Sequence, residues 1–576
     1  MVIIEKMIEG YLYKEMYMID LVIGKKMERF ILFIITLFIS LIAISQDQTI
    51  ALLSYKRHLA SDGYTLIYPR QQSSVFLINN CGEIVHEWED DDLYVPNNAV
   101  YLLDNGNLLK CKKHNDGPIG SGIGEYIVEI VSWDNVPLWS YELNTENERL
   151  HHDVEMLPNG NILMIAWERK SRDEAIASGR SEAKLTNNVL YPDYIFEINP
   201  QNNEKVWEWH VWDHLIQNID STKLNFGSVE QHPELVDINY VENTGSLDWD
   251  WMHTNAIDYH AGLDQIMLCV PYFNEAWIID HSTSTEEAAG HSGGLYDKGG
   301  DLLYRIGNPQ SYGRGSEDDK ILFFPHDTHW ANEFIDSTHS NYDDIVIFNN
   351  KNSNRTSSME IFDNPWNQDS SRYNLINGLY LPTSFTNSIY HPQPTKFYSS
   401  GLSSAQVLPN GNILGCSGGQ GYLLELSPTN EIVWEYKVPL KLGARAPQGT
   451  LIGYFQNLTF RAFKYPVYYS AFEGKDLSPK GHIEINPNIS FCDSLTSSID
   501  LISSDVNVFP NPATTELRIE WHNNKVHGIS IIDLLGKKLF DTQTQNNFEL
   551  VDISTYTPGV YIIIINQTFK KLFVVK

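Results

Sequence analysis

A seven-residue pattern that occurs three times constrains the fold of this chain more than any other feature. Each copy has an Asn-Gly-Asn turn flanked by aliphatic residues, and the copies stand at 103–109, 157–163 and 408–414. Asn-Gly between apolar runs predicts a β-hairpin with a type I′ turn, in which both central residues have positive φ. The first two copies lie 54 residues apart and the third follows 251 residues later, close to five units of about 50 residues, the length of a propeller blade. The spacing therefore predicts a β-propeller.

A second pattern marks the outer strands of the expected blades. Segments 84–88, 137–141, 205–209 and 432–436 alternate large apolar with polar residues, and 302–306 does so more loosely. Such alternation is typical of a half-buried strand. An aromatic content of 12% also favours a β-rich architecture over helical bundles.

Together the two patterns predict an all-β fold with a six-bladed β-propeller over residues 50–485. Its blades are expected at roughly 64–96, 97–150, 151–215, 250–310, 323–395 and 403–440. Residues 460–472 are expected to return and close the ring, which removes exposed sheet edges. A helix is expected only near 169–181, and the polar insertions 216–248 and 351–395 are expected to form loops over one face.

Residues 1–45 are expected to be an N-terminal extension and a secretory signal peptide. Lys25, Lys26 and Arg29 precede an apolar run over 30–44, and polar residues follow, which is the order of a signal peptide. A membrane anchor is the alternative, but this run is shorter than the roughly 20 apolar residues that span a bilayer. We therefore expect no transmembrane segment in the mature chain.

Charge and cysteine content exclude several classes of protein. The formal net charge is −32, which repels nucleic acid at long range, so nucleic acid is not expected as a partner. The five cysteines are widely spaced and include no CxxC pair. They form neither a zinc ribbon nor a dense disulfide scaffold. They allow one or two bridges, whose pairing the sequence leaves open.

From about residue 500 the chain changes in character. Val-Asn-Val-Phe-Pro-Asn-Pro at 506–512 opens a set of short strands, Pro-Gly-Val-Tyr at 558–561 starts the last hairpin, and the chain ends on Lys576. These features closely resemble the C-terminal sorting domain of the type IX secretion system of Bacteroidetes-like bacteria. The resemblance implies a small β-sandwich over 504–576 behind a linker at 486–503. It also implies a secreted or cell-surface protein that engages the type IX machinery. A small adhesive β-sandwich is the alternative.

Three phrases rich in histidine are candidates for chemistry. They are His151-His152-Asp153, Trp251-x-His253-x-Asn255 and His326-Asp327-x-His329. Each precedes or opens a strand-like run, where the innermost strand of a blade is expected to begin. The inner strands of a propeller converge on its central channel, so these side chains are expected to share one pocket.

These phrases resemble motifs of the arylsulfotransferase family. Further matching segments lie at 403–412 and 460–465, and the motifs follow the family's order over residues 60–475. The resemblance implies a six-bladed propeller that moves a sulfuryl group from an aryl sulfate to a phenolic acceptor through a sulfo-histidine. It implies no nucleotide sulfate donor, no cofactor and no metal. Donor and acceptor are then the small-molecule partners.

The resemblance also implies a role for each residue of the phrases. His326 is the expected nucleophile, since a neutral imidazole can form a covalent intermediate. His253 and Asn255 would bind sulfuryl oxygens, and His151 or His152 would serve as a further donor or acid. Asp327 is a candidate for fixing the tautomer of the nucleophile.

One departure from the family keeps other functions open. Active members carry an arginine in the strand after Trp-x-His-x-Asn, whereas 267–275 holds Pro271 and Tyr272 near that place. Arg461, Arg314 and Arg305 are the candidate replacements for this charged clamp. One alternative is a non-catalytic surface propeller that binds an aromatic or sulfated ligand. The other is a metal-assisted hydrolase that uses His326, Asp327 and His329 as ligands.

Overall fold

The computed structural model of the chain describes residues 48–576 apart from a set of short segments. The segments that it leaves out are 91–94, 114–118, 120–126, 186–187, 242–249, 353–355, 497–505, 522–526, 534–536, 545, 547 and 566–568. The expected extension and signal peptide at 1–45 lie outside the described residues, as do 497–503 of the expected linker.

Six antiparallel sheets of four or five strands make up the main body. The first contains, in spatial order, β35 (Thr459–Pro466), β2 (Gly63–Pro69), β3 (Ser74–Ile78) and β4 (Ile84–Glu89). The second contains β5 (Val95–Leu102), β6 (Leu108–Lys113), β7 (Ile127–Val131) and β8 (Pro137–Glu142). The third contains β9 (Glu148–Met156), β10 (Ile162–Glu168), β13 (Asp193–Asn199) and β14 (Glu204–His210).

The other three sheets follow along the chain. The fourth contains β17 (Ala256–His260), β18 (Gln265–Val270), β19 (Glu275–Asp280) and β20 (Tyr304–Ile306). The fifth contains β21 (His326–Trp330), β22 (Ile345–Asn352), β23 (Thr356–Phe362) and β28 (Asn387–Ile389). The sixth contains β29 (Ser404–Val407), β30 (Ile413–Ser417), β31 (Tyr422–Leu426), β32 (Ile432–Lys437) and β1 (Ala51–Tyr55).

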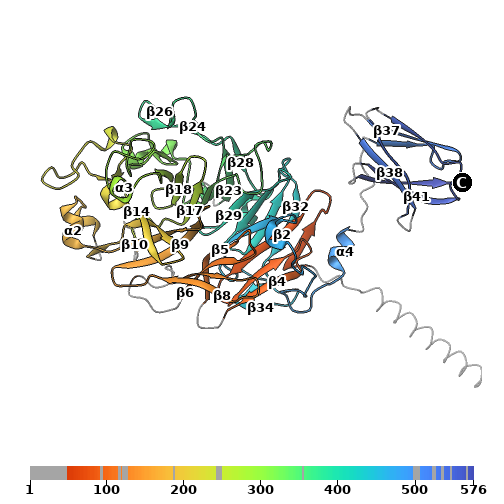
Figure 1. The fold of residues 1–576 in the computed structure, drawn as a ribbon, viewed down its shortest axis with the longest axis horizontal. Helices are drawn as coiled ribbons and strands as arrows, with labels where there is room; N and C mark the ends of the chain where they lie inside the picture. The colour runs from red at the N-terminus through yellow and green to blue at the C-terminus, as the bar shows by residue number, and fades with distance from the viewer. Residues whose placement is uncertain are drawn as a thin grey trace, which may run out of the picture. The chain divides into compact units, whose positions relative to one another are not determined.

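The innermost strands of these sheets contact one another in a closed circle. The order is β35, β5, β9, β17, β21, β29 and back to β35. Because β35 pairs with β2 and β32 pairs with β1, strands from the two ends of this region lie in common sheets. Figure 1 shows these early (orange) and late (cyan) strands side by side. The sheets fit the expected six-bladed propeller, and the predicted all-β class is confirmed.

All three predicted hairpins form, but the predicted turn type is wrong. They connect β5 to β6, β9 to β10 and β29 to β30. In the first, the Gly106 amide donates to the Leu103 carbonyl at 2.9 Å and the Leu103 amide donates to the Asn107 carbonyl at 2.8 Å. Only the glycine has positive φ, 82° at Gly106. This is the three-residue loop with a glycine bulge, whereas a type I′ turn would place the asparagine at positive φ too.

Two further expectations about local structure need correction. A helix does form inside 169–181, as α2 (Arg172–Ala177), but α3 (Thr285–Ala288) and α4 (Phe491–Thr496) were not expected. The stretch 351–395 contains β23 and β28, two strands of the fifth sheet, so only its middle is an insertion.

The remaining short strands are β11 (Lys170–Ser171), β12 (Val189–Leu190), β15 (Leu215–Ile216), β16 (Val236–Asp237), β24 (Trp366–Asn367), β25 (Arg372–Tyr373), β26 (Leu375–Ile376), β27 (Leu379–Tyr380), β33 (Leu440–Lys441) and β34 (Ala444–Arg445).

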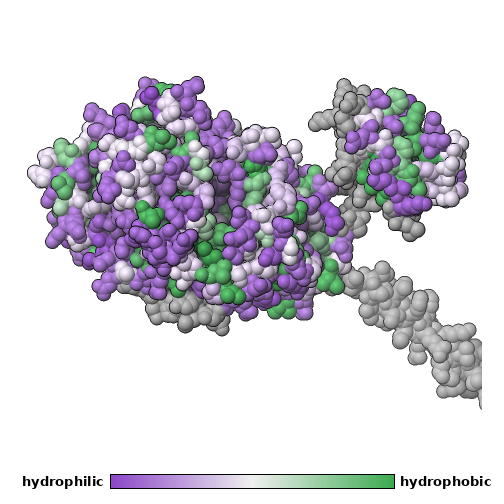
Figure 2. Space-filling view, in the orientation of Figure 1, coloured by the Kyte–Doolittle hydropathy of each residue, from purple (hydrophilic) through white to green (hydrophobic). Residues whose placement is uncertain are grey.

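The core lies between neighbouring sheets. One cluster packs Ile165 and Trp209 of the third sheet against Ile257 and Trp277 of the fourth. Buried aromatic side chains of this size dominate the energetics of a protein core. Figure 2 shows the visible outer surface to be mainly hydrophilic, as the net charge of −32 requires.

The C-terminal residues form a separate set of seven strands. These strands are β36 (Val506–Phe509), β37 (Glu516–Trp521), β38 (His527–Asp533), β39 (Lys538–Thr544), β40 (Phe548–Asp552), β41 (Gly559–Ile565) and β42 (Phe569–Val575). Three of them make one sheet and four make another. Ile519 of the first sheet and Ile531 of the second belong to one buried cluster. This is the predicted small β-sandwich. In the described part of the chain no helix is long and apolar enough to cross a membrane.

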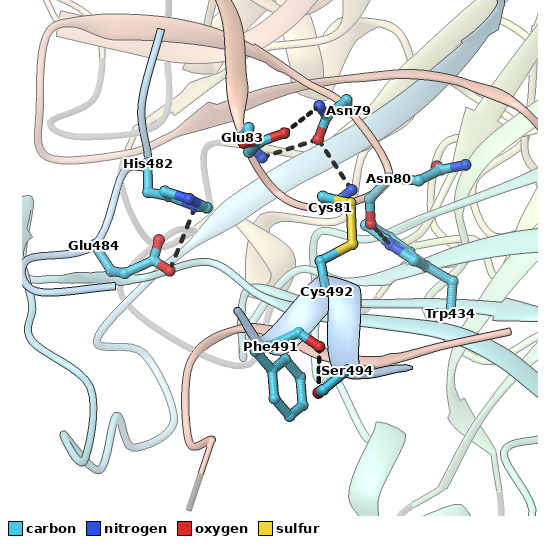
Figure 3. Close-up of a disulfide and its surroundings, with 10 residues drawn as sticks. All are labelled: Asn79, Asn80, Cys81, Glu83, Trp434, His482, Glu484, Phe491, Cys492 and Ser494. Carbon is cyan, nitrogen blue, oxygen red and sulfur yellow. Dashed lines mark hydrogen bonds and ion pairs between the residues drawn. A yellow bond between two sulfur atoms is a disulfide. The ribbon is translucent and has the colours of Figure 1, made fainter. Parts of the chain in front are cut away.

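A disulfide joins Cys81 at the turn before β4 to Cys492 in α4 (Figure 3). The neighbouring turn is held by Asn79, whose side chain bonds the Cys81 amide at 2.9 Å. Cys111, Cys269 and Cys416 are buried and reduced. The bridge fastens the segment that follows the propeller to its first sheet.

The substitution Cys492→Ser is expected to lower the free energy of unfolding by about 2–4 kcal/mol, because the bridge restricts the unfolded chain. Guanidinium unfolding with and without a reductant measures the effect. The wild type in reductant should match the variant, and the variant should not respond to reductant. Equal stability of the two proteins without reductant would show that the bridge adds nothing.

Candidate active site

Three innermost strands bring three of the predicted histidines together. His152 lies in β9, His253 precedes β17, and His326 is the first residue of β21. The rings of His152 and His253 meet edge to face with centroids 4.5 Å apart, and the Phe324 ring lies 6.3 Å from His253 and 5.7 Å from His326, centroid to centroid. All three are buried, with 3%, 9% and 2% of their surfaces exposed. We call these residues the histidine cluster.

The backbone at the histidine cluster adopts conformations that ordinary residues avoid. The φ angles are 61° at His152, 61° at His253, 56° at Asp327 and 61° at Leu402. The pairing of β9 and of β21 with the next strand is irregular here. Bulges of this kind re-aim side chains, and local strain gathers at functional sites. They allow consecutive residues, such as His326 and Asp327, to reach the channel.

Hydrogen bonds fix the tautomer of His326. Its Nδ1 lies 2.8 Å from Oδ1 of Asn350. The Asn350 amide nitrogen donates to the carbonyl of Leu402 at 2.8 Å and to that of Ser399 at 3.1 Å, so the amide oxygen faces the ring. Nδ1 of His326 therefore carries the proton and Nε2 keeps the lone pair. That lone pair accepts the Leu402 amide at 3.0 Å.

The other two histidines of the cluster also direct Nε2 away from their partners. His253 donates Nδ1–H to Asp250 at 2.5 Å. His152 Nδ1 lies 2.9 Å from Nδ1 of His151, whose Nε2 is 3.3 Å from the Asp193 carboxylate. The lone pair of His253 is therefore on Nε2.

Burial keeps two of these rings uncharged. Desolvation, followed by the charges of His253 and His151, lowers the pKa of His152 well below its usual range. Desolvation and His253 likewise lower the pKa of His326 to about 3. Both rings are neutral at neutral pH, which is the nucleophilic state of imidazole.

Two aromatic side chains stand beside the histidine cluster. Tyr272 stacks on His253 with centroids 4.9 Å apart and ring planes 14° from parallel. Phe324 lies 5.8 Å from Tyr272 and 5.7 Å from His326. Both are partly exposed, so they present a flat apolar surface to a ligand next to the neutral histidines.

The layer below the histidine cluster is a buried charge network around Arg461 of β35. Its guanidinium pairs with Asp153 at 2.8 Å and with Asp327 at 3.1 Å, and it donates to the Tyr101 hydroxyl. Asp153 follows His152 in the chain, and Asp327 follows His326. Burial raises the pKa of Asp327 to about 7 even though Arg461 acts against this shift.

Beyond this network the channel opens into a cavity of about 620 Å³. Its lining includes Glu155, Asp258, His329, Glu333 and Arg461. Burial, with Asp258 and Asp327 nearby, raises the pKa of Glu333 to about 7. The histidine cluster is not among the described residues that line this cavity. The Arg461 network therefore lines this cavity, and the histidine cluster lies outside its lining.

Two predicted residues lie beside the histidine cluster in supporting positions. His151 is fully buried and stacks on Trp167, with centroids 4.1 Å apart. Asn255 is also fully buried and donates Nδ2–H to the Pro325 carbonyl at 3.0 Å. Its amide supports the turn before His326 in this structure, and the binding of a sulfuryl oxygen by Asn255 stays a prediction.

None of the three candidate arginines presents a free charge to the histidine cluster. Arg461 is neutralised by two carboxylates. Arg305 is fully buried in an ion pair with Glu275. Arg314 donates to the Glu230 carbonyl at 2.6 Å, and its described contacts include no residue of the cluster. In this structure Arg461 and Arg314 bond to groups of the protein itself, and their substrate-binding roles stay predictions.

The alternative metal site is not supported. Among the described residues, His326, Asp327 and His329 do not converge as a group of ligands, whereas His214, His291 and Asp301 do. His214 already bonds Asp301 through Nδ1 and the Ala288 carbonyl through Nε2, both at 2.8 Å. It has no lone pair left for a metal ion.

The sequence patterns did not indicate several residues that lie around the histidine cluster. Asp250 and Phe324 stand two or three positions before a predicted histidine, so their proximity in sequence was a usable signal. Asn350 and Leu402 reach His326 from other segments, and nothing in their own surroundings marks them.

Comparison with known proteins adds two family matches. A family model described as arylsulfotransferase (ASST) matches residues 58–440. A second, described as a secretion system C-terminal sorting domain, matches residues 507–576. None of the curated proteins matches the chain significantly.

Solved structures show only distant similarity. A protein of unknown function from Bacteroides caccae is 12% identical, covers 70% of this chain and 99% of its own, and has a TM-score of 0.37. Virginiamycin B lyase from Staphylococcus aureus is 11% identical, covers 68% and 89%, and has a TM-score of 0.31. Similarity this low carries no argument about function.

Proposed function

The chain belongs to the arylsulfotransferase family, and we propose that it transfers a sulfuryl group from an aryl sulfate to a phenolic acceptor through a sulfo-histidine. The observation that carries this proposal is the convergence of His152, His253 and His326, two of them held neutral by burial. An arylsulfotransferase-like activity is what the family indicates. The reaction and its intermediate are the proposal.

His326 is the proposed nucleophile. Its Nε2 lone pair forms a bond to sulfur while the bond from sulfur to the aryl oxygen breaks, and the phenolate leaves with that electron pair. The Leu402 amide, 3.0 Å from Nε2, would pass from the lone pair to a sulfuryl oxygen. In the second step the acceptor oxygen attacks sulfur, the N–S bond breaks, and Nε2 recovers its lone pair.

His253 is the proposed carrier of the proton. Asp250 holds its Nδ1–H at 2.5 Å and would stabilise the imidazolium that forms when Nε2 takes the proton of the acceptor phenol. In the first step Nε2 of His253 carries no proton, so the donor leaves as phenolate, and the imidazolium formed in the second step releases its proton to water. His152, whose pKa burial lowers, would pack against His253 as a neutral ring.

Tyr272 and Phe324 are the proposed walls for the aromatic part of donor and acceptor. They flank His253 and His326 and are partly exposed. A phenyl ring stacked there would place its ester oxygen near the histidines.

A propeller that binds an aromatic or sulfated ligand without turnover is the second candidate. The observation that favours it is the hydrogen bond from the Leu402 amide to Nε2 of His326. In this arrangement the lone pair of the proposed nucleophile is already engaged.

The C-terminal sorting domain indicates export through the type IX secretion system to the cell surface or outside the cell. Engagement of the secretion machinery therefore belongs to residues 507–576. Small aryl sulfates and phenols in that environment are the proposed substrates.

Mixing the full chain with an aryl sulfate and a phenol tests the proposal. Release of the donor phenol should require the added acceptor, and the acceptor should gain the sulfuryl group. Without an acceptor, mass spectrometry should find one sulfuryl group on the peptide that contains His326. Tight binding of the aryl sulfate with neither release nor labelling would instead establish the second candidate.

A further inference from the structure

Lys351 is a charged residue beside the histidine cluster that the proposed mechanism has not used. It lies near the end of β22, next to Asn350, the residue that fixes the tautomer of His326. Its backbone amide donates to the Phe323 carbonyl at 2.9 Å. Its ammonium stands 3.7 Å above the ring centroid of Phe324.

The Phe324 ring, which carries this ammonium on its face, has two of the histidines as neighbours. The Phe324 ring lies 5.7 Å from His326 and 6.3 Å from His253, centroid to centroid. Lys351 also contributes to the lowered pKa of His326, after burial and the charge of His253. The positive charge of Lys351 therefore disfavours protonation of the proposed nucleophile.

Within the described part of the chain, no carboxylate pairs with the Lys351 ammonium. The three candidate arginines, by contrast, have partners within the protein. Arg461 pairs with Asp153 and Asp327, Arg305 pairs with Glu275, and Arg314 donates to the Glu230 carbonyl. Partial burial lowers the pKa of Lys351, as expected for a cation with few partners. A cation held over an aromatic face is available to an anion.

We propose that Lys351 binds the sulfate group of the donor and supplies the positive charge that the family's missing arginine would otherwise provide. The inference rests on the proposed function for the identity of the anion. An ammonium is a point charge on a flexible stem, so it reaches a tetrahedral oxyanion without the fixed geometry of a guanidinium. Tyr272 lies in the turn between β18 and β19, near the place where the arginine is expected, and stacks on His253.

Lys351→Met keeps the stem of the side chain and removes its charge. With an aryl sulfate donor and saturating phenol, we expect its KM for the donor to rise about 10-fold to 100-fold with little change in kcat, because the charge binds ground state and transition state alike. Lys351→Arg should recover most of the loss. Added salt should raise the KM of the wild type and leave that of Lys351→Met nearly unchanged.

Lys320→Met is the matched control. Lys320 stands 5.1 Å above the neighbouring Phe323 ring, but it pairs with Glu317. Its loss should leave both the KM for the donor and its salt dependence unchanged. Thermal unfolding of each variant shows whether the fold is intact.

Titration calorimetry with inorganic sulfate separates this inference from the proposed function. The wild type and Lys320→Met should bind sulfate, and Lys351→Met should bind it at least about 10-fold more weakly. If neither the wild type nor the two variants turn over aryl sulfate but this difference in sulfate affinity remains, the proposed function is wrong and the proposed role of Lys351 is supported. If the wild type is active while Lys351→Met has the same KM and sulfate affinity, the inference is wrong. A wild type that does not bind sulfate also overturns it.

Discussion

Replacing His326 with alanine is expected to lower acceptor-dependent release of phenol from an aryl sulfate by about 1,000-fold or more, because the covalent route is then lost. Hydrogen bonds hold its Nε2 as the lone-pair nitrogen, and its pKa of about 3 keeps the ring neutral. Initial rates with saturating phenol measure the effect. Labelling of the His326 peptide should disappear with the activity.

His329→Gln is the control for that substitution. His329 lies three residues further along the same strand, and its side chain lines the cavity beyond the Arg461 network. Its removal should change the rate by less than about threefold, since surroundings away from the reacting atoms contribute little. If His326→Ala keeps a tenth of the wild-type rate, the nucleophile is His152 or His253, whose Nε2 atoms are directed away from their partners.

The substitution Arg461→Met is expected to lower the free energy of unfolding by about 3–5 kcal/mol, since it leaves buried carboxylates without their counter-charge. Asp153 and Asp327 both pair with this guanidinium, and both are almost completely buried. Guanidinium unfolding of the variant and the wild type measures the loss. Adding Asp327→Asn to Arg461→Met should restore part of it, because one unpaired charge is removed.

Arg445→Met provides a surface comparison. Arg445 pairs with Glu87 at 3.1 Å, and 43% of its side chain is exposed. Its loss should cost less than about 1 kcal/mol. An equally small effect of Arg461→Met would mean that the buried network adds no net stability.

The decrease in the free energy of unfolding caused by Arg461→Met should also depend on pH. Burial raises the folded-state pKa of Asp327 from 3.8 to about 7, so the folded protein holds this proton more tightly than the unfolded chain. The stability that this carboxyl contributes therefore falls as pH rises from about 4 to 7. Arg461 opposes the shift, and its removal raises the pKa further. The variant should be more strongly destabilised at pH 8 than at pH 5, and the reverse order would contradict the assignment.

Local sequence identified the hairpins but not their turn geometry. The Asn-Gly-Asn phrases form hairpins, as predicted, and these hairpins connect the inner and second strands of three sheets. Gly106 alone takes a positive φ, because the number of residues between the paired strands selects the loop type. The strand register that sets this number depends on packing against neighbouring sheets.

Local sequence also did not indicate how the side chains of the histidine phrases are oriented. His151 and His152 are adjacent, and the sequence alone left open which of them belongs to the site. Successive residues of a strand point in opposite directions unless a bulge re-aims them. The irregular pairing of β9 and the positive φ of His152 decide the matter, with His151 stacked on Trp167 and His152 against His253.

The sequence by itself determined what repeating patterns and short motifs carry: an all-β chain, the positions of three hairpins, the sorting domain and the three histidine phrases. These features are local, so periodicity and turn chemistry suffice to reveal them. Only the tertiary structure decided which charges are available. Arg461 was a candidate for binding sulfate, yet Asp153 and Asp327, each more than 100 residues away in the sequence, pair with it. Lys351 acquired its place beside His326 because β22 pairs with β21 and Phe324 lies beneath its ammonium. Charge pairing between distant segments follows from the closed arrangement of the sheets, and a local sequence pattern does not predict which distant segments meet.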